Sequence, residues 1–389
     1  MSDLNVPKAA PAQALDALDT PALLLDETRM KRNIARLRQR LAALGVRFRP
    51  HIKTGKSLEV ARRLTSAAGG PIAVSTLKEA EYFAAGGFTD ITYAVGLAPE
   101  KIARAQSLVA QGVDLAVVID SAEQAHALAE AARAGGQMPA VLVEIDCDGH
   151  RGGLVPADPL LLTIAGILRD SGVELRGVLT HAGDSYLCRD GRGLPEAAEA
   201  ERAAAVEAAG LLRNLGHAAP VVSVGSTPTA HFARDLTGVT EVRAGVFVFF
   251  DLVMHGIGVC AIDDIALSVL ATVIGHKPDK GWILIDAGWM ALSRDRGTAN
   301  HPIDQGHGLV CNADGVPYGD LIVVDASQEH GIIAVRPGST DALPDIPIGA
   351  QVRVLPNHAC ATGSQHDLYH LVRTGSRDLV ATWPRMRGW

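Results

Sequence analysis

The sequence predicts an α/β protein in which a (β/α)8 barrel precedes a C-terminal β domain. Between residues 46 and 250, eight short runs of strand-forming residues alternate with alanine-rich stretches of helical composition. Chemically active side chains follow several of these runs, and a parallel barrel builds its active site at the carboxyl ends of its strands. From about residue 255, strand-like runs joined by turns replace the alternation. This change in the pattern of expected strands and helices predicts a second domain.

The first expected elements are a strand at residues 20–26 and a long helix at residues 27–44. We expect the strand to pair with the C-terminal β domain. The predicted organisation is therefore an N-terminal segment (residues 1–26), a barrel (27–254) and a β domain (255–389). A β domain of about 130 residues has an ordinary domain size.

The eight runs expected to form the barrel have the length and composition of strands. They lie at residues 46–52, 72–76, 91–95, 115–120, 141–146, 177–182, 221–225 and 241–249. Helical stretches between them include residues 99–111, 121–134 and 195–215. Strands that alternate with helices form parallel sheets, and eight such units can close a barrel. A doubly wound open sheet is the alternative, because a count of strands does not establish closure.

The β domain is expected to contain several strands with little helix between them. The predicted strands lie at residues 266–275, 282–287, 320–328, 351–355, 368–373 and 378–383.

The overall composition excludes several classes of protein. Of the 389 residues, 48% are hydrophobic, so the chain can bury a large core and is not disordered. The net charge is −7 and there is no long basic run, which argues against nucleic acid as a partner. No apolar run could cross a membrane, and the N-terminus lacks the pattern of a signal peptide. Five cysteines without short paired spacings indicate reduced thiols, so we expect a cytoplasmic protein.

Lys53 is the first candidate for a chemical role. It directly follows the run 46–52, and in a strand its side chain would point to the same side as that of His51. A lysine in this place can form a Schiff base if burial and neighbouring cations lower its pKa. The ordinary alternative is a solvated surface lysine. The residues farther along the chain favour the chemical role.

Two later runs also end in polar residues. Arg151 follows the run 141–146, and His181 ends the run 177–182 with Tyr186 five residues behind. The ordinary alternative for His181 is a core histidine that bonds a backbone group. Residues at the ends of barrel strands are placed for catalysis or binding.

Gly225, Ser226 and Thr227 lead from a run into a helix. Backbone N–H groups and hydroxyls at such a turn can form a cradle for an anion. An ordinary helix N-cap is an equally good interpretation. Arg243 differs from the other candidates, because it lies near the beginning of the last run.

His358 and Cys360 form a candidate metal site. They lie two residues apart in an apparently extended segment, so both side chains can face one side. Imidazole and thiolate groups suit Zn²⁺, and two protein ligands leave positions open, as in catalytic sites. A chance buried pair is the alternative. His366 and His370 are a weaker rival pair, in a segment that we expect to be a surface turn leading into a strand.

Taken together, these motifs resemble the fold-type III pyridoxal phosphate enzymes, in which an alanine-racemase-like barrel precedes a β domain. Within that group, the chain resembles the branch of the D-serine dehydratases and D-threonine aldolases. The resemblance extends from about residue 19 to residue 389. The segments that carry it most specifically are residues 49–54, 222–229, 241–251, 286–298, 328–331 and 356–362.

The resemblance implies a role for each candidate residue. Lys53 is the expected Schiff-base lysine, and the expected catalytic residues are Lys53, His51 and His181. The expected cofactor-binding residues are Lys53, Arg151, His181, Tyr186, Gly225, Ser226, Thr227, Arg243, Gly245 and Val246. His358 and Cys360 are the expected ligands of a divalent metal, Zn²⁺ in the first place and Mn²⁺ or Co²⁺ as alternatives. Arg243 would face the pyridine nitrogen, whereas Arg151 would contact either the cofactor O3′ or a substrate carboxylate.

The implied activity is dehydration of a β-hydroxy-D-amino acid, such as 3-hydroxy-D-aspartate or D-serine, to a 2-oxo acid and ammonia. Retro-aldol cleavage to glycine and an aldehyde is the alternative, and a pyridoxal phosphate-binding protein without catalysis is a remote one. Cys360 favours the dehydratase, because some aldolases of the group have aspartate there. Gly55 and Asp184 stand where many members have histidine, which bears on substrate preference. The resemblance also implies a homodimer.

Overall fold

The computed structural model describes residues 14–189 and 191–389. Its contacts divide the chain into two compact units. One unit contains Ile34–Phe247 together with Met386–Trp389, and the other contains the residues up to Asn33 together with Val248–Arg385. The predicted domain boundaries at residues 26/27 and 254/255 stay a prediction, and residues 1–13 of the predicted N-terminal segment lie outside the described part.

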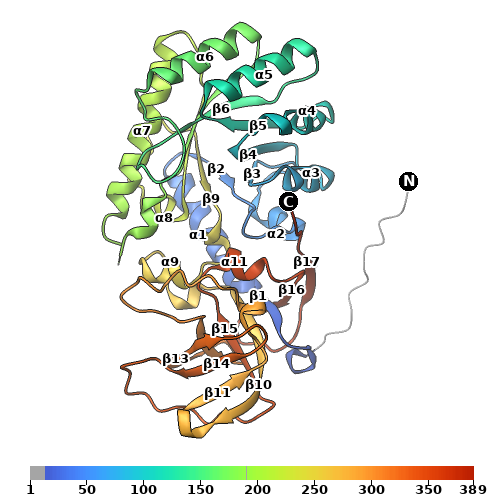
Figure 1. Cartoon of the computed structure of the whole chain (residues 1–389), viewed down its shortest axis with the longest axis vertical. Coiled ribbons are helices and arrows are strands. Elements are labelled where there is room, and N and C mark those ends of the chain that lie inside the picture. The colour runs from blue at the N-terminus through green and yellow to red at the C-terminus, as the bar shows by residue number, and fades with distance from the viewer. Residues whose placement is uncertain (1–13, 190) are drawn as a thin grey trace, which may run out of the picture. The chain divides into compact units, whose positions relative to one another are not determined.

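The first unit is built on eight parallel strands (Figure 1). They are β2 (Arg47–Pro50), β3 (Ile72–Val74), β4 (Asp90–Gly96), β5 (Asp114–Ile119), β6 (Ala140–Ile145), β7 (Leu175–Thr180), β8 (Val221–Val224) and β9 (Glu241–Ala244). The order β2-β9-β8-β7-β6-β5-β4-β3 would leave β2 and β3 as edges. A bridge between His51 and Ala73 joins them, with the Ile52 N–H 2.9 Å from the Ala73 carbonyl oxygen. The barrel is therefore nearly closed, and the predicted fold is confirmed.

Helices follow the strands, as the alternating pattern predicted. They are α2 (Leu58–Leu64), α3 (Leu77–Ala85), α4 (Ile102–Ala110), α5 (Ala122–Ala134), α6 (Pro159–Ser171), α7 (Leu194–Asn214) and α8 (Thr227–Phe232). Local signals explain their ends: a capping box between Ser121 and Gln124 starts α5, and Gly172 in the left-handed conformation ends α6. Helix α1 (Glu27–Ala43) begins in the second unit and continues in the first.

The last barrel strand is shorter than predicted. Residues 241–249 were expected to form one strand, but β9 ends at Ala244 and a 3-10 turn, η4 (Val246–Val248), follows. The chain passes close to β2 there: a Cβ atom on Gly245 would lie 3.2 Å from the carbonyl oxygen of His51. The chain thus leaves the strand direction after Ala244.

The second unit contains one nine-stranded sheet. Its strands are β1 (Ala22–Asp26), β10 (Leu267–Lys277), β11 (Trp282–Ile285), β12 (Leu309–Asn312), β13 (Pro317–Ala326), β14 (Gly331–Val335), β15 (Gln351–Leu355), β16 (Leu368–Val372) and β17 (Ala381–Pro384). The order is β11-β14-β13-β12-β15-β10-β1-β16-β17, and an additional β10–β11 pairing closes six of the strands into a barrel. Strand β1 lies between β10 and β16.

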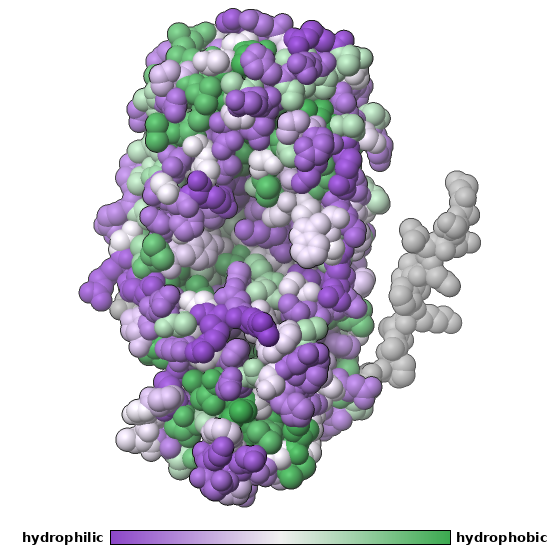
Figure 2. Space-filling view, in the orientation of Figure 1, coloured by the Kyte–Doolittle hydropathy of each residue, from purple (hydrophilic) through white to green (hydrophobic). Residues whose placement is uncertain are grey.

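Two strands of this sheet, β12 and β14, were not predicted. Strand β12 has only four residues and lies in a stretch rich in glycine and polar residues, so its own sequence gives little signal. Hydrophilic residues cover much of the face shown in Figure 2. Within the described part of the chain, no helix has the length and apolar character needed to cross a membrane.

Candidate active site

Lys53 follows β2 directly, in a turn closed by a hydrogen bond from the Lys56 N–H to the Ile52 carbonyl at 2.9 Å. The Lys53 side chain is exposed, and its backbone N–H lies 3.4 Å from Nδ1 of His51. The Met386 N–H bonds the carbonyl of Lys56 at 2.6 Å. The turn thus presents a lysine amine at the carboxyl end of a barrel strand, where the sequence predicted it.

Five basic groups lie within electrostatic reach of one another at this end of the barrel. The pKa of His51 is lowered well below its ordinary value, first by burial and then by the positive charges of Lys53, Arg243, His181 and Arg151. Two of these cations come from different parts of the barrel, Arg151 from the loop after β6 and Arg243 from β9 itself. Such a group can bind an anion, and its histidines are neutral near neutral pH.

His181 is held in one tautomer. Its Nδ1 atom lies 2.9 Å from the carbonyl oxygen of Gly225, which can only accept, so Nδ1 carries the proton and Nε2 has a lone pair. Burial lowers the His181 pKa to about 3, although the bond to Gly225 opposes this shift. The Tyr186 ring lies in the 3-10 turn η3 (Asp184–Leu187), with its centroid 6.3 Å from that of His181.

The turn after β8 has the geometry of an anion cradle. Gly225 has φ +140°, and a Cβ atom there would lie 1.9 Å from the carbonyl oxygen of Arg243, so only glycine fits. Ser226 caps α8 in a capping box with Thr229.

Nearby, the Thr227 hydroxyl accepts the Phe247 N–H at 3.3 Å. Among the described residues, none accepts a hydrogen bond from the buried N–H of Gly245 or of Val246. These two donors suit the oxygens of a phosphate.

Arg243 is buried inside the barrel. Its guanidinium donates to the Ser223 hydroxyl at 2.6 Å and to the Thr180 carbonyl at 2.6 Å. Burial lowers its pKa, against the charges of Glu241, Glu201 and Glu144. Because Ser223 in turn donates to Glu241 at 2.7 Å, its lone pair is directed at Arg243. The arginine is therefore fixed across three strands.

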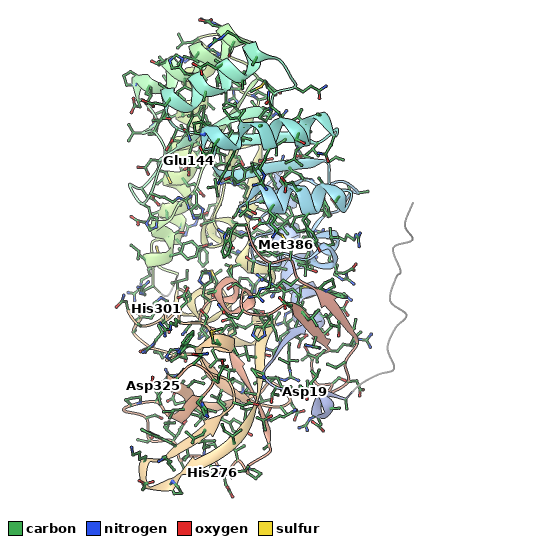
Figure 3. All side chains as sticks on the ribbon, turned by 45° about the vertical axis from the view of Figure 1, so that its right-hand side comes forward. Asp19, Glu144, His276, His301, Asp325 and Met386 are labelled. Atoms are coloured by element: carbon green, nitrogen blue, oxygen red, sulfur yellow. The ribbon has the colours of Figure 1, made fainter. Side chains whose placement is uncertain are left out.

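Arg151 lies in the loop after β6 with an exposed side chain, 3.4 Å from Glu144 (labelled in Figure 3). Burial raises the pKa of Glu144, and the charge of Arg151 opposes this. In the same loop, His150 lies 2.9 Å from Asp184. Asp184, where the family resemblance led us to expect histidine, thus pairs with a histidine from the neighbouring loop.

The predicted metal ligands lie in the second unit, and their backbone differs from the prediction. His358 is the N-cap of the short helix α11 (Ala359–Gly363), so Cys360 lies in a helical turn and not in an extended segment. The chain curls because the Thr362 N–H bonds the His358 carbonyl at 3.1 Å, which starts a helix. The two side chains still meet, because the His358 ring and the Cys360 sulfur share a hydrogen bond that raises the pKa of His358.

A carboxylate orients the His358 ring. Nδ1 of His358 lies 2.6 Å from Asp295, while buried Asp251 accepts the N–H of Ala359 at 2.9 Å. Burial disfavours protonation of His358, but the bonds to Asp295 and Cys360 and the charge of Asp251 outweigh it and raise the pKa to about 11. Among the described residues, no three His, Cys, Asp or Glu side chains are grouped to hold a metal. The assignment of His358 and Cys360 as metal ligands stays a prediction, with Asp295 bonded to the imidazole.

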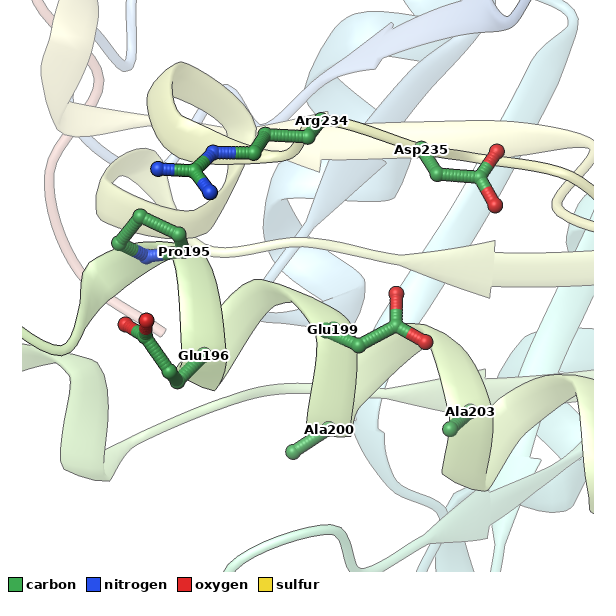
Figure 4. A pocket seen from close by; sticks show the side chains of 7 residues that line it. All are labelled: Pro195, Glu196, Glu199, Ala200, Ala203, Arg234 and Asp235. Atoms are coloured by element: carbon green, nitrogen blue, oxygen red, sulfur yellow. The ribbon is translucent and has the colours of Figure 1, made fainter.

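A pocket of about 530 Å³ opens elsewhere on the barrel unit, along α7 (Figure 4). Its lining residues are Pro195, Glu196, Glu199, Ala200, Ala203, Arg234 and Asp235. Glu199 is already bonded to Arg202, at 2.5 and 2.8 Å. None of the predicted site residues lines this pocket, so we assign it no part in the chemistry.

The sequence did not reveal three carboxylates that hold the candidate residues. Asp251 follows an apolar run and Asp295 lies in a charged loop, and neither position shows from the sequence which residue it would hold. The sequence does contain a signal for Glu201, because this residue shares one face of α7 with Ala198, Ala205 and Ala208, at helical spacing. A charged residue on an otherwise apolar helix face is expected to have a polar partner, because charged residues are rarely fully buried without one.

Comparison with known proteins agrees with this geometry. The family model of the alanine racemase N-terminal domain matches residues 25–253, and that of a putative serine dehydratase domain matches residues 266–372. The chain therefore belongs to the fold-type III pyridoxal phosphate enzymes, in the branch of the D-serine dehydratases. The family resemblance seen in the motifs is confirmed.

Within this branch, the chain is 54% identical to D-threo-3-hydroxyaspartate dehydratase of Delftia sp. (strain HT23), over 96% of this chain and 98% of that one. It is 31% identical to D-serine dehydratase of Dictyostelium discoideum, over 93% and 95%. The solved structure of the Delftia enzyme has a TM-score of 0.93 at 53% identity, covering 97% of this chain and all of that one. A further structure of that enzyme is a cysteine-to-alanine mutant in the metal-free form.

Proposed function

We propose that this chain is a pyridoxal phosphate-dependent lyase that removes water from a β-hydroxy-D-amino acid. The products are a 2-oxo acid and ammonia, and the preferred substrate is 3-hydroxy-D-aspartate, followed by D-serine. The observation that carries the proposal is the group of Lys53, His51, His181, Arg151 and Arg243 at one end of the barrel. Its charge suits a ligand that bears a phosphate and carboxylates.

The similarity of the chain favours dehydration over aldol cleavage. The match to a dehydratase is at 54% identity, whereas the D-threonine aldolase of Arthrobacter sp. and the 3-hydroxy-D-aspartate aldolase of Paracoccus denitrificans match at 30% and 29%. All three matches extend over nearly the whole chain, so the difference is not one of coverage.

The residues of the barrel fit the cofactor. Lys53 would hold it covalently through its ε-amino group, and the cradle formed by residues 225–227, Gly245 and Val246 would bind its phosphate. His181, neutral and held by Gly225, would lie against the ring, with Tyr186 beside it. Arg243 would face the ring nitrogen. Pyridoxal phosphate supplies an electron sink for the charge that develops at Cα.

Proton transfer is the task of the lysine. With its ε-amino group free, Lys53 would accept the proton from Cα of the substrate. His51 and His181 are kept neutral by burial and by the neighbouring cations, so they do not repel the protonated lysine. Arg151, on an exposed loop, would bind either a substrate carboxylate or the cofactor O3′.

A divalent metal would be held by His358 and Cys360. Zn²⁺ suits an imidazole and a thiolate, and Mn²⁺ or Co²⁺ are alternatives. The metal supplies Lewis acidity that makes the β-hydroxyl a better leaving group. Asp295 would orient the imidazole, as carboxylates do behind many metal-bound histidines. Loss of water leaves an enamine, which tautomerises to an imine, and hydrolysis releases the 2-oxo acid and ammonia.

An absorbance spectrum of the purified protein, supplied with pyridoxal phosphate, is the first test. D-threo-3-hydroxyaspartate is then added with and without a chelator, and Lys53→Ala serves as the control. A cofactor band with chelator-sensitive release of ammonia and oxaloacetate is the expected result. Glycine and an aldehyde would instead identify an aldolase, and a band without turnover a binding protein. No band at all would refute the cofactor assignment.

We also propose that the protein is a homodimer in the cytoplasm. A symmetric dimer is the commonest oligomer of soluble proteins, and the family resemblance points the same way. Light scattering on the cofactor-loaded protein tests this, with an expected mass of twice 40.8 kDa. A monomer mass would contradict it.

A further inference from the structure

Glu201 is a fully buried carboxylate that the proposed reaction does not use. It lies on α7 with 1% of its surface exposed. Its Oε1 atom accepts the N–H of Ala182 at 3.0 Å and the N–H of Gly225 at 2.9 Å. Ala182 and Gly225 lie just beyond the ends of β7 and β8. One carboxylate oxygen therefore joins the carboxyl ends of two neighbouring barrel strands.

These two ends carry parts of the candidate site. Ala182 directly follows His181, and Gly225 begins the turn that forms the anion cradle. The His181 ring also bonds the Gly225 carbonyl, at 2.9 Å. Gly225 is thus held on both sides, its N–H by Glu201 and its carbonyl by His181. The orientation and the tautomer of the His181 ring both depend on the position of the Gly225 backbone.

The hydrogen-bond partners of Glu201 favour its ionised form, although burial has the larger effect on its pKa. Burial raises its pKa, but a hydrogen bond from the Thr229 hydroxyl and those from Gly225 and Ala182 oppose the rise. All three partners donate, and a carboxylate is a pure acceptor. Thr229 also forms the capping box that starts α8 with Ser226. The same carboxylate therefore helps to set the beginning of the helix behind the cradle.

A purely structural role would need only a link between α7 and the sheet. The observed link is more specific, because it bonds the backbone of the residue after His181 and of the first residue of the cradle. Mid-strand groups of β7 and β8 are satisfied by the sheet itself. Strand ends lack such partners and are free to shift unless a side chain holds them.

We propose that Glu201 is a positioning residue of the active site. Its carboxylate holds the His181 ring and the turn at residues 225–227 in the arrangement that receives the cofactor phosphate and ring. The ligand in this proposal rests on the proposed function, whereas the control of His181 by Glu201 is a property of the protein alone.

The test compares Glu201→Gln and Glu201→Ala with Leu212→Ala, a substitution of another buried residue on α7 that lies about three helical turns beyond Glu201. Titration with pyridoxal phosphate measures the dissociation constant. Glu201→Gln keeps one acceptor and loses the charge, so we expect the constant to rise about tenfold. Glu201→Ala loses every bond and should raise it about a hundredfold. Leu212→Ala should lower stability but leave the constant unchanged.

A second readout needs no cofactor. Nitrogen-15 NMR of labelled histidines, with His181 assigned by its substitution with Gln, identifies the tautomer. We expect the Nδ1–H form in the wild type and in Leu212→Ala, and a mixture of tautomers in Glu201→Ala. A wild-type dissociation constant and tautomer in Glu201→Gln and Glu201→Ala would overturn the proposal. If the wild type itself bound no cofactor, the proposed function would fail, and the tautomer would still decide the role of Glu201.

Discussion

The buried ion pair beneath the candidate site allows a quantitative prediction. In β2, Nε of Arg49 lies 2.9 Å from both carboxylate oxygens of Glu241, and Nη1 lies 2.6 Å from Asp90. Arg49 is 6% exposed and Glu241 2%. In Arg49→Met, Glu241 would remain in the barrel with the Ser223 hydroxyl as its main partner. A buried charge left without its partner costs about 3–5 kcal/mol of unfolding free energy.

The double substitution Arg49→Met with Glu241→Met tests the cause. It replaces both charges by apolar side chains of similar length, so most of the loss should be recovered. The matched control is Arg104→Met, which breaks an exposed pair with Glu81 (2.9 Å) and should cost less than about 1 kcal/mol.

Urea unfolding of all variants, followed by far-ultraviolet circular dichroism, measures the differences. The reasoning would be refuted if Arg49→Met lost no more stability than the exposed control. It would also fail if the double variant were as unstable as the single one.

Three further predictions concern the candidate site. Gly225→Ala should abolish pyridoxal phosphate binding, because its Cβ would lie 1.9 Å from a backbone oxygen, whereas Gly166→Ala has nothing within 4 Å and should bind normally; equal absorbance titrations would contradict the cradle. Asp295→Asn should weaken metal affinity by about 10- to 100-fold, measured by metal content after dialysis, and Cys188→Ala should not; an unchanged metal content would exclude the orienting role. The pKa of His181 is about 3 in the folded chain, below its ordinary value, so its burial stabilises the protein fully above about pH 6.5 and progressively less as the pH falls towards 3. The unfolding free energy, measured across this pH range, should fall less steeply with falling pH for His181→Gln than for the wild type. Equal slopes would contradict the lowered pKa of His181.

The barrel could be predicted because each of its strands is a local signal. Parallel strands buried on both faces are continuous apolar runs, and alanine-rich helices separate them clearly. The β domain was predicted less completely, since β12 and β14 are four and five residues long and owe their conformation to neighbouring strands. A short strand next to glycine and polar turns has little local preference of its own.

Within the candidate site, the positions of Lys53, His181 and residues 225–227 could be predicted from the sequence, because these residues follow strands in the chain. Their supports could not. Glu201 lies 19 residues from Ala182 and 24 from Gly225, and Asp295 lies 63 from His358, so no local spacing relates them. The helical turn at Cys360 was missed because a five-residue helix carries no periodic signal.

The sequence by itself determined the succession of strands and helices, the family, and which residue types stand at the strand ends. It did so because periodicity and motifs are properties of neighbouring residues. Only the tertiary structure decided that His181 is neutral with its proton on Nδ1, that Gly245 turns the chain at the barrel end, and that Glu201 joins two strand ends. These properties depend on burial and on hydrogen bonds between residues far apart in the chain, which only the closed barrel brings together.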